Sequence, residues 1–291
     1  MYKQIDSNRH KTVLIMAVFF AIMLGLGWVL SLAFNNNLYL VLAVGISLIQ
    51  AYISYYHGDS IALAISQAQE IKHNQNEQLF HIVENLCITA GLPMPKIYII
   101  PDSAPNAFAT GRDPQHASLA VTSGILEKLN KTELEGVIAH ELSHIGNRDI
   151  LVMTVVMILA GAIAMLSDFF LRSLWFRGRD DRNNSGQIIM LIGIVLAILT
   201  PIVASLMQLA VSRKREYLAD ASGALLTRYP EGLASALEKI SVDKEPLEAA
   251  NKATAMLYIE NPLKDRQGWL NSLFSTHPPV ADRIKKLRSM A

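Results

Sequence analysis

Along this chain, pairs of long apolar runs alternate twice with stretches in which polar and apolar residues are mixed. Four runs of about twenty residues are apolar and almost free of charge: 12–34, 38–56, 151–170 and 188–210. A helix of this length can cross a hydrocarbon core of about 30 Å. We therefore expect an N-terminal transmembrane hairpin (1–56), a first globular part (57–150), a second hydrophobic hairpin (151–210) and a second globular part (211–291).

The charges that flank these runs predict an orientation. Basic residues precede the first run and follow the fourth, and the positive-inside rule places both ends in the cytoplasm; they are Lys3, Arg9, Lys11, Arg213, Lys214 and Arg215. The link 171–186 also carries four arginines, and a full crossing of the second hairpin would place them outside, against this rule. The second hairpin therefore either crosses the bilayer despite these charges or dips into it and returns. In both cases the two globular parts lie on one side.

The alternative for the first run is a cleaved signal peptide. The run is longer than the apolar region of a signal peptide, which spans about 7–15 residues. Three asparagines follow it, where small residues would mark a cleavage site. We therefore interpret the run as a membrane helix.

The composition agrees with a membrane-bound chain. Hydrophobic residues make up 51% of it, slightly above the roughly 45–50% of soluble domains. The formal net charge of +1 gives no indication of a nucleic-acid partner. The only cysteine, Cys87, excludes an internal disulfide, and its apolar neighbours favour a buried structural thiol over a reactive one.

The globular parts predict a mostly helical α+β fold with a small sheet. Residues 77–91 have apolar positions at helical spacing, with Gly91 as the C-cap. Segments 96–100 and 117–122 are predicted strands. Thr132 and Glu135 match a capping box, which predicts the start of the next helix.

That helix carries the sequence HELSH at 140–144. His140 and His144 are four residues apart, so a helix places both imidazoles on one face, where they can bind one zinc ion. Glu141 can then reach a zinc-activated water as a general base. The alternative is a pair of solvated histidines on a helix surface, because this short pattern also occurs by chance.

A catalytic zinc site needs a third protein ligand. Ile150 stands where a metzincin would have its third histidine, which excludes that class. Glu216 and Asp220 are again four residues apart: Glu216 can bind zinc, and Asp220 can hold a ligand histidine in place. The alternative for Glu216 is an exposed acid among the neighbouring basic residues.

These motifs together resemble the HtpX-like membrane zinc metalloproteases, which are gluzincins related to the CAAX prenyl proteases. The resemblance extends over nearly the whole chain and rests on PNAFATG (105–111), HELSHIGNRD (140–149), RKREYLAD (213–220) and THPPVADRI (276–284). It implies that His140, His144 and Glu216 bind one zinc ion per subunit and that Glu141 is the catalytic base.

Three further residues have two interpretations each. His277, next to two prolines, is a candidate donor to the oxyanion of the tetrahedral intermediate, or a histidine at a helix start without a role. Asn106 resembles a position beside a substrate-binding edge strand, or is a turn residue after Pro105. Asp149 either braces the end of the HELSH helix or faces solvent.

The resemblance implies a zinc endopeptidase of the bacterial inner membrane that cuts misfolded or damaged membrane proteins in stress-related quality control. Its active site would face the cytoplasm, and its partners would be the lipid bilayer and unfolded or misassembled membrane proteins, with no nucleic acid. One alternative is a zinc-binding scaffold without turnover. Another is a metal transporter, which requires ionisable residues inside the spans, where this chain has almost none.

Overall fold

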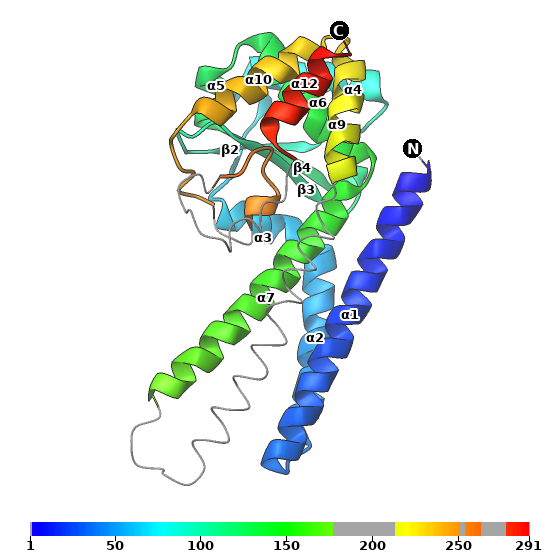
Figure 1. The fold of residues 1–291 in the computed structure, drawn as a ribbon, viewed down its shortest axis with the longest axis vertical. Helices are drawn as coiled ribbons and strands as arrows, with labels where there is room; N and C mark the ends of the chain where they lie inside the picture. The colour runs from blue at the N-terminus through cyan, green and yellow to red at the C-terminus, as the bar shows by residue number, and fades with distance from the viewer. Residues whose placement is uncertain (1, 177–212, 251–253, 263–277, 291) are drawn as a thin grey trace.

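The computed structural model describes residues 2–176, 213–250, 254–262 and 278–290. It shows a globular part at one end and long helices that extend from it at the other (Figure 1). The N-terminus lies at the globular end, because the first helix runs away from that end and the second returns to it (Figure 1).

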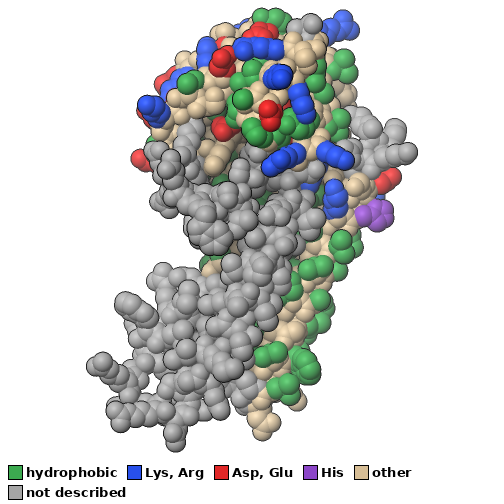
Figure 2. Space-filling view, viewed as in Figure 1, with side chains coloured by type: hydrophobic (Ala, Val, Ile, Leu, Met, Phe, Trp, Pro, Cys, Tyr) green, Lys and Arg blue, Asp and Glu red, His purple; other side chains and the backbone are tan. Residues whose placement is uncertain are grey.

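Helices α1 (Tyr2–Phe34) and α2 (Leu38–Tyr56) form the predicted N-terminal hairpin. Both are long and apolar enough to cross a membrane, with mean hydropathies of 2.7 over Ile5–Leu32 and 1.7 over Leu38–Tyr56. Large apolar side chains such as Val13, Leu32 and Val41 are about two-thirds exposed, as expected of a surface that faces lipid. On the face shown in Figure 2, charged side chains gather over the globular part and the first turns of α1.

The third apolar run is confirmed as helix α7 (Asp149–Phe176). It follows α6 (Lys131–Gly146) at an angle of 83°, and the two helices taken as one bent unit are long and apolar enough for a third span. The first turns of α7 are buried in the globular part, and the helix then extends on the same side as α1 and α2 (Figure 1). The fourth predicted helix, 188–210, and the end of the link before it lie outside the described residues.

The globular part contains a four-stranded sheet in the order β1-β2-β4-β3. Its strands are β1 (Gln69–Glu70), β2 (Lys96–Ile100), β3 (Ala107–Gly111) and β4 (Ala117–Thr122). β2 and β4 are parallel, and both outer strands are antiparallel to their neighbours. The two predicted strands are confirmed. The periodicity of β3 did not indicate a strand, because all five of its residues are buried and no alternation marks them.

Helices enclose this sheet and form the main core with it. The larger ones are α4 (Glu77–Ala90), α6, α9 (Arg213–Thr227), α10 (Pro230–Val242) and α12 (Val280–Arg288). Shorter elements are α3 (Gly58–Ile65), α5 (Ser123–Lys128), η1 (His73–Gln75), η2 (Pro114–His116) and η3 (Thr254–Met256). The predicted helix at 77–91 is confirmed, and Gly91 ends it at a φ of +64°, a left-handed conformation that suits glycine. Cys87 is buried, as predicted.

The predicted capping box at Thr132 and Glu135 is wrong. Helix α6 is capped by Asn130, whose side chain accepts a hydrogen bond from the amide of Glu133 at 3.0 Å. The carboxylate of Glu133 in turn accepts a hydrogen bond from the amide of Asn130 at 2.8 Å. Glu133 is buried against Ser235 and Lys239 of α10, whereas Thr132 is exposed. Tertiary packing therefore selects the earlier of two overlapping capping patterns.

Candidate metal centre

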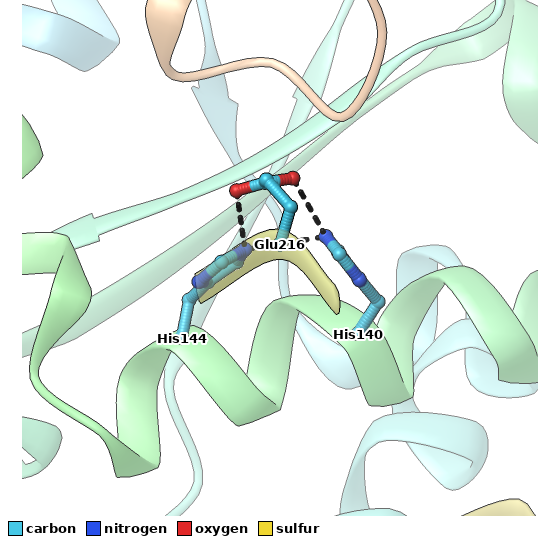
Figure 3. A group of neighbouring side chains, drawn as sticks. All are labelled: His140, His144 and Glu216. Atoms are coloured by element: carbon cyan, nitrogen blue, oxygen red, sulfur yellow. Dashed lines mark hydrogen bonds and ion pairs between the residues drawn. The ribbon is translucent and has the colours of Figure 1, made fainter. Parts of the chain in front are cut away.

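Two helices bring together the three predicted zinc ligands. His140 and His144 lie on one face of α6, and α9 places Glu216 opposite them, with one carboxylate oxygen toward each imidazole (Figure 3). The two Nε2 atoms are 3.2 Å apart. The Glu216 oxygens are 3.8 Å from Nε2 of His140 and 3.6 Å from Nε2 of His144. Two ligands of one tetrahedral zinc ion, each about 2 Å from it, are roughly 3.3 Å apart, so this arrangement fits one ion.

The charge of the surrounding groups also fits a divalent cation. Four acids and two arginines are buried around the imidazoles, which leaves a surplus of two negative charges when all are ionised: Glu141, Asp149, Glu216, Asp220, Arg215 and Arg283. A buried surplus of this kind is costly unless a cation compensates it. Burial and the nearby charge of Glu216 raise the pKa of Glu141 to about 8, which shows how unfavourable a further negative charge is there.

A glycine allows α9 to approach α6 closely. Glu216, Asp220 and Gly223 are spaced at four and three residues and so share one face of α9. A Cβ atom at Gly223 would lie only 3.0 Å from the backbone nitrogen of His140. The close approach buries Glu216 to 2% exposure, so the alternative of an exposed acid is wrong.

Each imidazole has a carboxylate at its other nitrogen. Asp220 Oδ1 lies 3.0 Å from Nδ1 of His140, and Asp149 Oδ2 lies 3.1 Å from Nδ1 of His144. A carboxylate at Nδ1 favours the tautomer that leaves Nε2 available to an ion. Burial alone would lower the pKa of His144, but Asp149 and nearby acids raise it to about 9. Asp149 is 1% exposed, so it braces the end of α6 and does not face solvent.

Arg283 is part of the centre, although sequence reasoning gave it no role. It is fully buried and donates to Asp220 from Nε at 2.9 Å and from Nη2 at 2.7 Å. Its Nη1 donates to the carbonyl of Ile259 at 3.0 Å and lies 4.0 Å from Glu216. The available signal was a lone arginine on the apolar face of α12, three residues after Val280 and four residues before Leu287.

Glu141 lies against the outer edge of the sheet. Asn106 pairs with Thr122 of β4, so the backbone groups of Ala107 and Ala109 point away from β4, as alternation in an antiparallel pair requires. The backbone amide of Ala109 is near the carboxylate of Glu141 and favours its charged form. The candidate base is therefore held beside the edge of an outer strand.

Asn106 precedes β3 directly and is 2% exposed. Its side-chain amide donates to the carbonyl of Glu260 at 3.0 Å, and its Oδ1 accepts from the amide of Ala107 at 3.1 Å. The amide of Ile259 donates to the carbonyl of Ala107 at 3.0 Å. Asn106 therefore joins β3 to the segment that covers the first part of its edge. His277, the other predicted site residue, lies outside the described residues.

Comparisons with known proteins agree with this geometry. Residues 73–291 match peptidase family M48. The chain is 46% identical over 300 residues to a protease HtpX homolog of Lactobacillus helveticus, with all of both chains covered. It is 45% identical over 296 residues to a protease HtpX homolog of Caldanaerobacter subterraneus, covering 100% of this chain and 98% of the relative.

A solved structure shares the fold. The crystal structure of S. mikatae Ste24p aligns with a TM-score of 0.52 and 19% sequence identity, covering 99% of this chain and 67% of that one. The family match includes both the HELSH helix and the Glu216 helix, and the relatives align along the full chain, including the apolar hairpin. This chain belongs to peptidase family M48 and is a membrane metalloprotease.

Proposed function

We propose that this chain is a zinc-dependent endopeptidase in which His140, His144 and Glu216 hold the ion and Glu141 is the general base. The observation that carries the proposal is the convergence of three buried ligand atoms from two helices within 4.8 Å of one another, with Glu141 next to them. When bound, zinc lowers the pKa of a water to about 7 and polarises the scissile carbonyl.

Glu141 is suited to move the proton. Burial raises its pKa, and the charge of a bound cation would lower that pKa again, so the group can both accept and release a proton near neutrality. It takes the proton of the attacking water and returns it to the leaving amine. His277 is our proposed donor to the oxyanion that forms on the substrate.

The edge of β3 supports a mode of substrate binding. An extended peptide can add to an outer strand through backbone hydrogen bonds, and the edge at Ala109 adjoins Glu141. The segment around Ile259 occupies the edge at Ala107. A peptide would therefore join β3 from Ala109 onward, which suits unfolded or misassembled chains because their backbone is available.

The position of the site supports membrane proteins as substrates. His144 lies in the last turn of α6, directly before the 83° bend into α7. The site is thus at the start of α7, which further along extends from the globular part on the same side as α1 and α2 (Figure 1). We propose that it faces the cytoplasm at the bacterial inner membrane and acts on misfolded or damaged membrane proteins close to that surface.

Cleavage of an unfolded protein such as casein tests the catalytic assignment. Wild type, Glu141→Gln and Glu135→Gln would be purified in detergent, and their zinc content and cleavage rates compared. Glu135 is a matched control, because it lies on the same helix and contacts only Lys131, at 3.9 Å, among the ion pairs of the described residues. Glu141→Gln should bind zinc normally and lose about 10²–10⁴-fold in rate, whereas Glu135→Gln should cut like wild type. Zinc binding without cleavage by any variant would favour the silent scaffold.

Thiol labelling tests the orientation. Cys87 is buried and would be replaced by alanine, and a new cysteine would be placed at the exposed Lys131. In intact cells a membrane-impermeant reagent should label this position only after permeabilisation. Labelling of intact cells would contradict a cytoplasmic active site.

A further inference from the structure

Helix α1 buries one stripe of its surface, and a polar residue stands at the globular end of this stripe. The stripe recurs every three or four residues through Asn8, Thr12, Ile15, Phe19 and Met23, all of them at most 7% exposed. Its apolar members belong to the same core cluster as the first half of α7. The register of α1 against α7 therefore determines where the side chain of Asn8 lies.

Asn8 reaches the metal centre through two hydrogen bonds. Its Nδ2 donates to the carbonyl of Asn147 at 2.9 Å and to Oδ1 of Asp149 at 2.7 Å. The other oxygen of Asp149 lies 3.1 Å from Nδ1 of His144. A membrane helix is thus connected to a proposed zinc ligand through a single intervening carboxylate.

The two contacts of Asn8 have different consequences. The bond to Asn147 satisfies a carbonyl at the C-terminus of α6, which is a structural contribution. The bond to Asp149 fixes the rotation of a carboxylate whose oxygens serve two partners. Arg215 lies 3.6 Å from the same Oδ1 atom. We expect that, without Asn8, Asp149 rotates toward this guanidinium and away from His144.

We infer that Asn8 is a positioning residue of the zinc site, which holds His144 in its binding orientation through Asp149. This inference rests on the proposed function, since it assumes that His144 binds the ion. It makes the N-terminal hairpin a component of the site as well as an anchor. A slip of α1 by one helical turn, about 5.4 Å, would remove Asn8 from Asp149 and weaken zinc binding.

Zinc affinity of the full-length protein in detergent tests the inference. The affinity would be measured by competition with a chromogenic chelator for wild type, Asn8→Ala, Asp149→Ala and the double variant. Loss of an outer contact of a metal ligand weakens metal binding by about 10–100-fold, so we expect Asp149→Ala in that range and Asn8→Ala near tenfold. The double variant should bind no more weakly than Asp149→Ala, because both changes act through one carboxylate.

Thr12→Val is the matched control. Thr12 lies one turn further along the same buried stripe, but within the described part of the chain its hydroxyl bonds only to the carbonyl of Asn8 in the same helix, at 2.9 Å. This variant should keep wild-type zinc affinity. Substitution with Co²⁺ adds a spectroscopic readout: Asn8→Ala should shift the visible absorption bands of the bound ion, and Thr12→Val should not. If Asn8→Ala fails to fold, Asn8→Ser, which is too short to reach Asp149, should give the same loss.

Several results would overturn the inference. Wild-type zinc affinity in a folded Asn8→Ala protein would show that Asn8 only stabilises the helix contact. Independent, multiplicative losses in the double variant would show that Asn8 does not act through Asp149. The proposed function would be contradicted by a different result, namely a wild-type protein that binds zinc but cuts no substrate. In that case the effect of Asn8→Ala on zinc affinity would still decide the inference.

Discussion

Arg283 of α12 clamps Asp220 of α9 with two hydrogen bonds, from Nε at 2.9 Å and from Nη2 at 2.7 Å. Both residues are almost completely buried. Asp220 in turn lies 3.0 Å from Nδ1 of His140. The last helix of the chain therefore supports a histidine that is distant in sequence, and this pair connects the stability of the fold to the geometry of the site.

Arg283→Met should destabilise the protein and release zinc. The change leaves the buried carboxylate of Asp220 without its charged partner, and breaking a buried pair costs about 3–5 kcal/mol. Arg283→Lys keeps the charge but loses the two-pronged geometry, so its effect should be intermediate. Thermal unfolding and zinc content would be measured for both. Lys285→Met, an exposed change on the same helix, should alter neither, and a stable, zinc-loaded Arg283→Met protein would contradict this account.

Gly223→Val should separate α9 from α6. A Cβ atom there would meet the backbone of His140 at 3.0 Å, and backbone cannot move aside as a flexible side chain can. Glu216 would then withdraw from the imidazoles, so zinc affinity should fall together with stability. Gly161→Val is the control, because a Cβ atom at Gly161 meets no atom of the described residues within 4 Å. Equal zinc affinity in both variants would show that the close approach is not required.

Zinc should stabilise the folded protein through Glu216. An ion at 1,000 times its Kd adds about 4.1 kcal/mol, which raises the unfolding temperature by roughly 10 °C for a chain of this size. A chelator should remove this increase in wild type. In Glu216→Gln the increase should be much smaller even without chelator, because the carboxylate among the three ligand groups becomes a neutral amide. An unchanged increase in that variant would exclude Glu216 as a ligand.

Glu133→Ala should destabilise the start of α6, whereas Glu135→Ala should not. Glu133 caps the helix and contacts Ser235 and Lys239, and loss of a cap costs about 1 kcal/mol. Lys239 is half exposed, so solvent screens its ion pair and the cap supplies most of the effect. Unfolding temperatures compared at pH 7 would distinguish the two variants. A larger loss of stability in Glu135→Ala would instead support the capping box that the sequence predicted at Thr132 and Glu135.

The contribution of Glu133 should depend on pH. Burial alone would raise its pKa, but the hydrogen bonds from Lys239 and from the amide of Asn130 hold the pKa below the ordinary value of 4.5. A carboxyl group of this kind stabilises the fold fully above pH 4.5 and loses its effect as the pH falls through its lowered pKa. The stability difference between wild type and Glu133→Ala should therefore shrink below pH 4.5. Measurement in excess chelator excludes zinc loss, and a difference that grows on acidification would contradict the sign.

Local sequence motifs were sufficient to predict several helices and the placement of two candidate ligands. The apolar runs predicted α1, α2 and α7, since a helix that faces lipid must be apolar over its length. The HELSH spacing placed two imidazoles on one face, because the helical repeat alone decides that. The capping box, in contrast, had two candidates two residues apart, and packing of Glu133 against α10 decided between them.

The tertiary structure decided what surrounds the three ligands. The sequence left two interpretations of Asp149 open, and only its burial beside Asn8 decided between them. Asn8 and Asp149 are 141 positions apart. Arg283 and Asp220 are 63 positions apart, and nothing in either segment identifies the other. A periodic pattern reports which face of an element is buried, because burial removes apolar area from water wherever the element packs. It does not report which buried polar group meets which, since that depends on how distant helices approach one another, as α9 approaches α6 at Gly223.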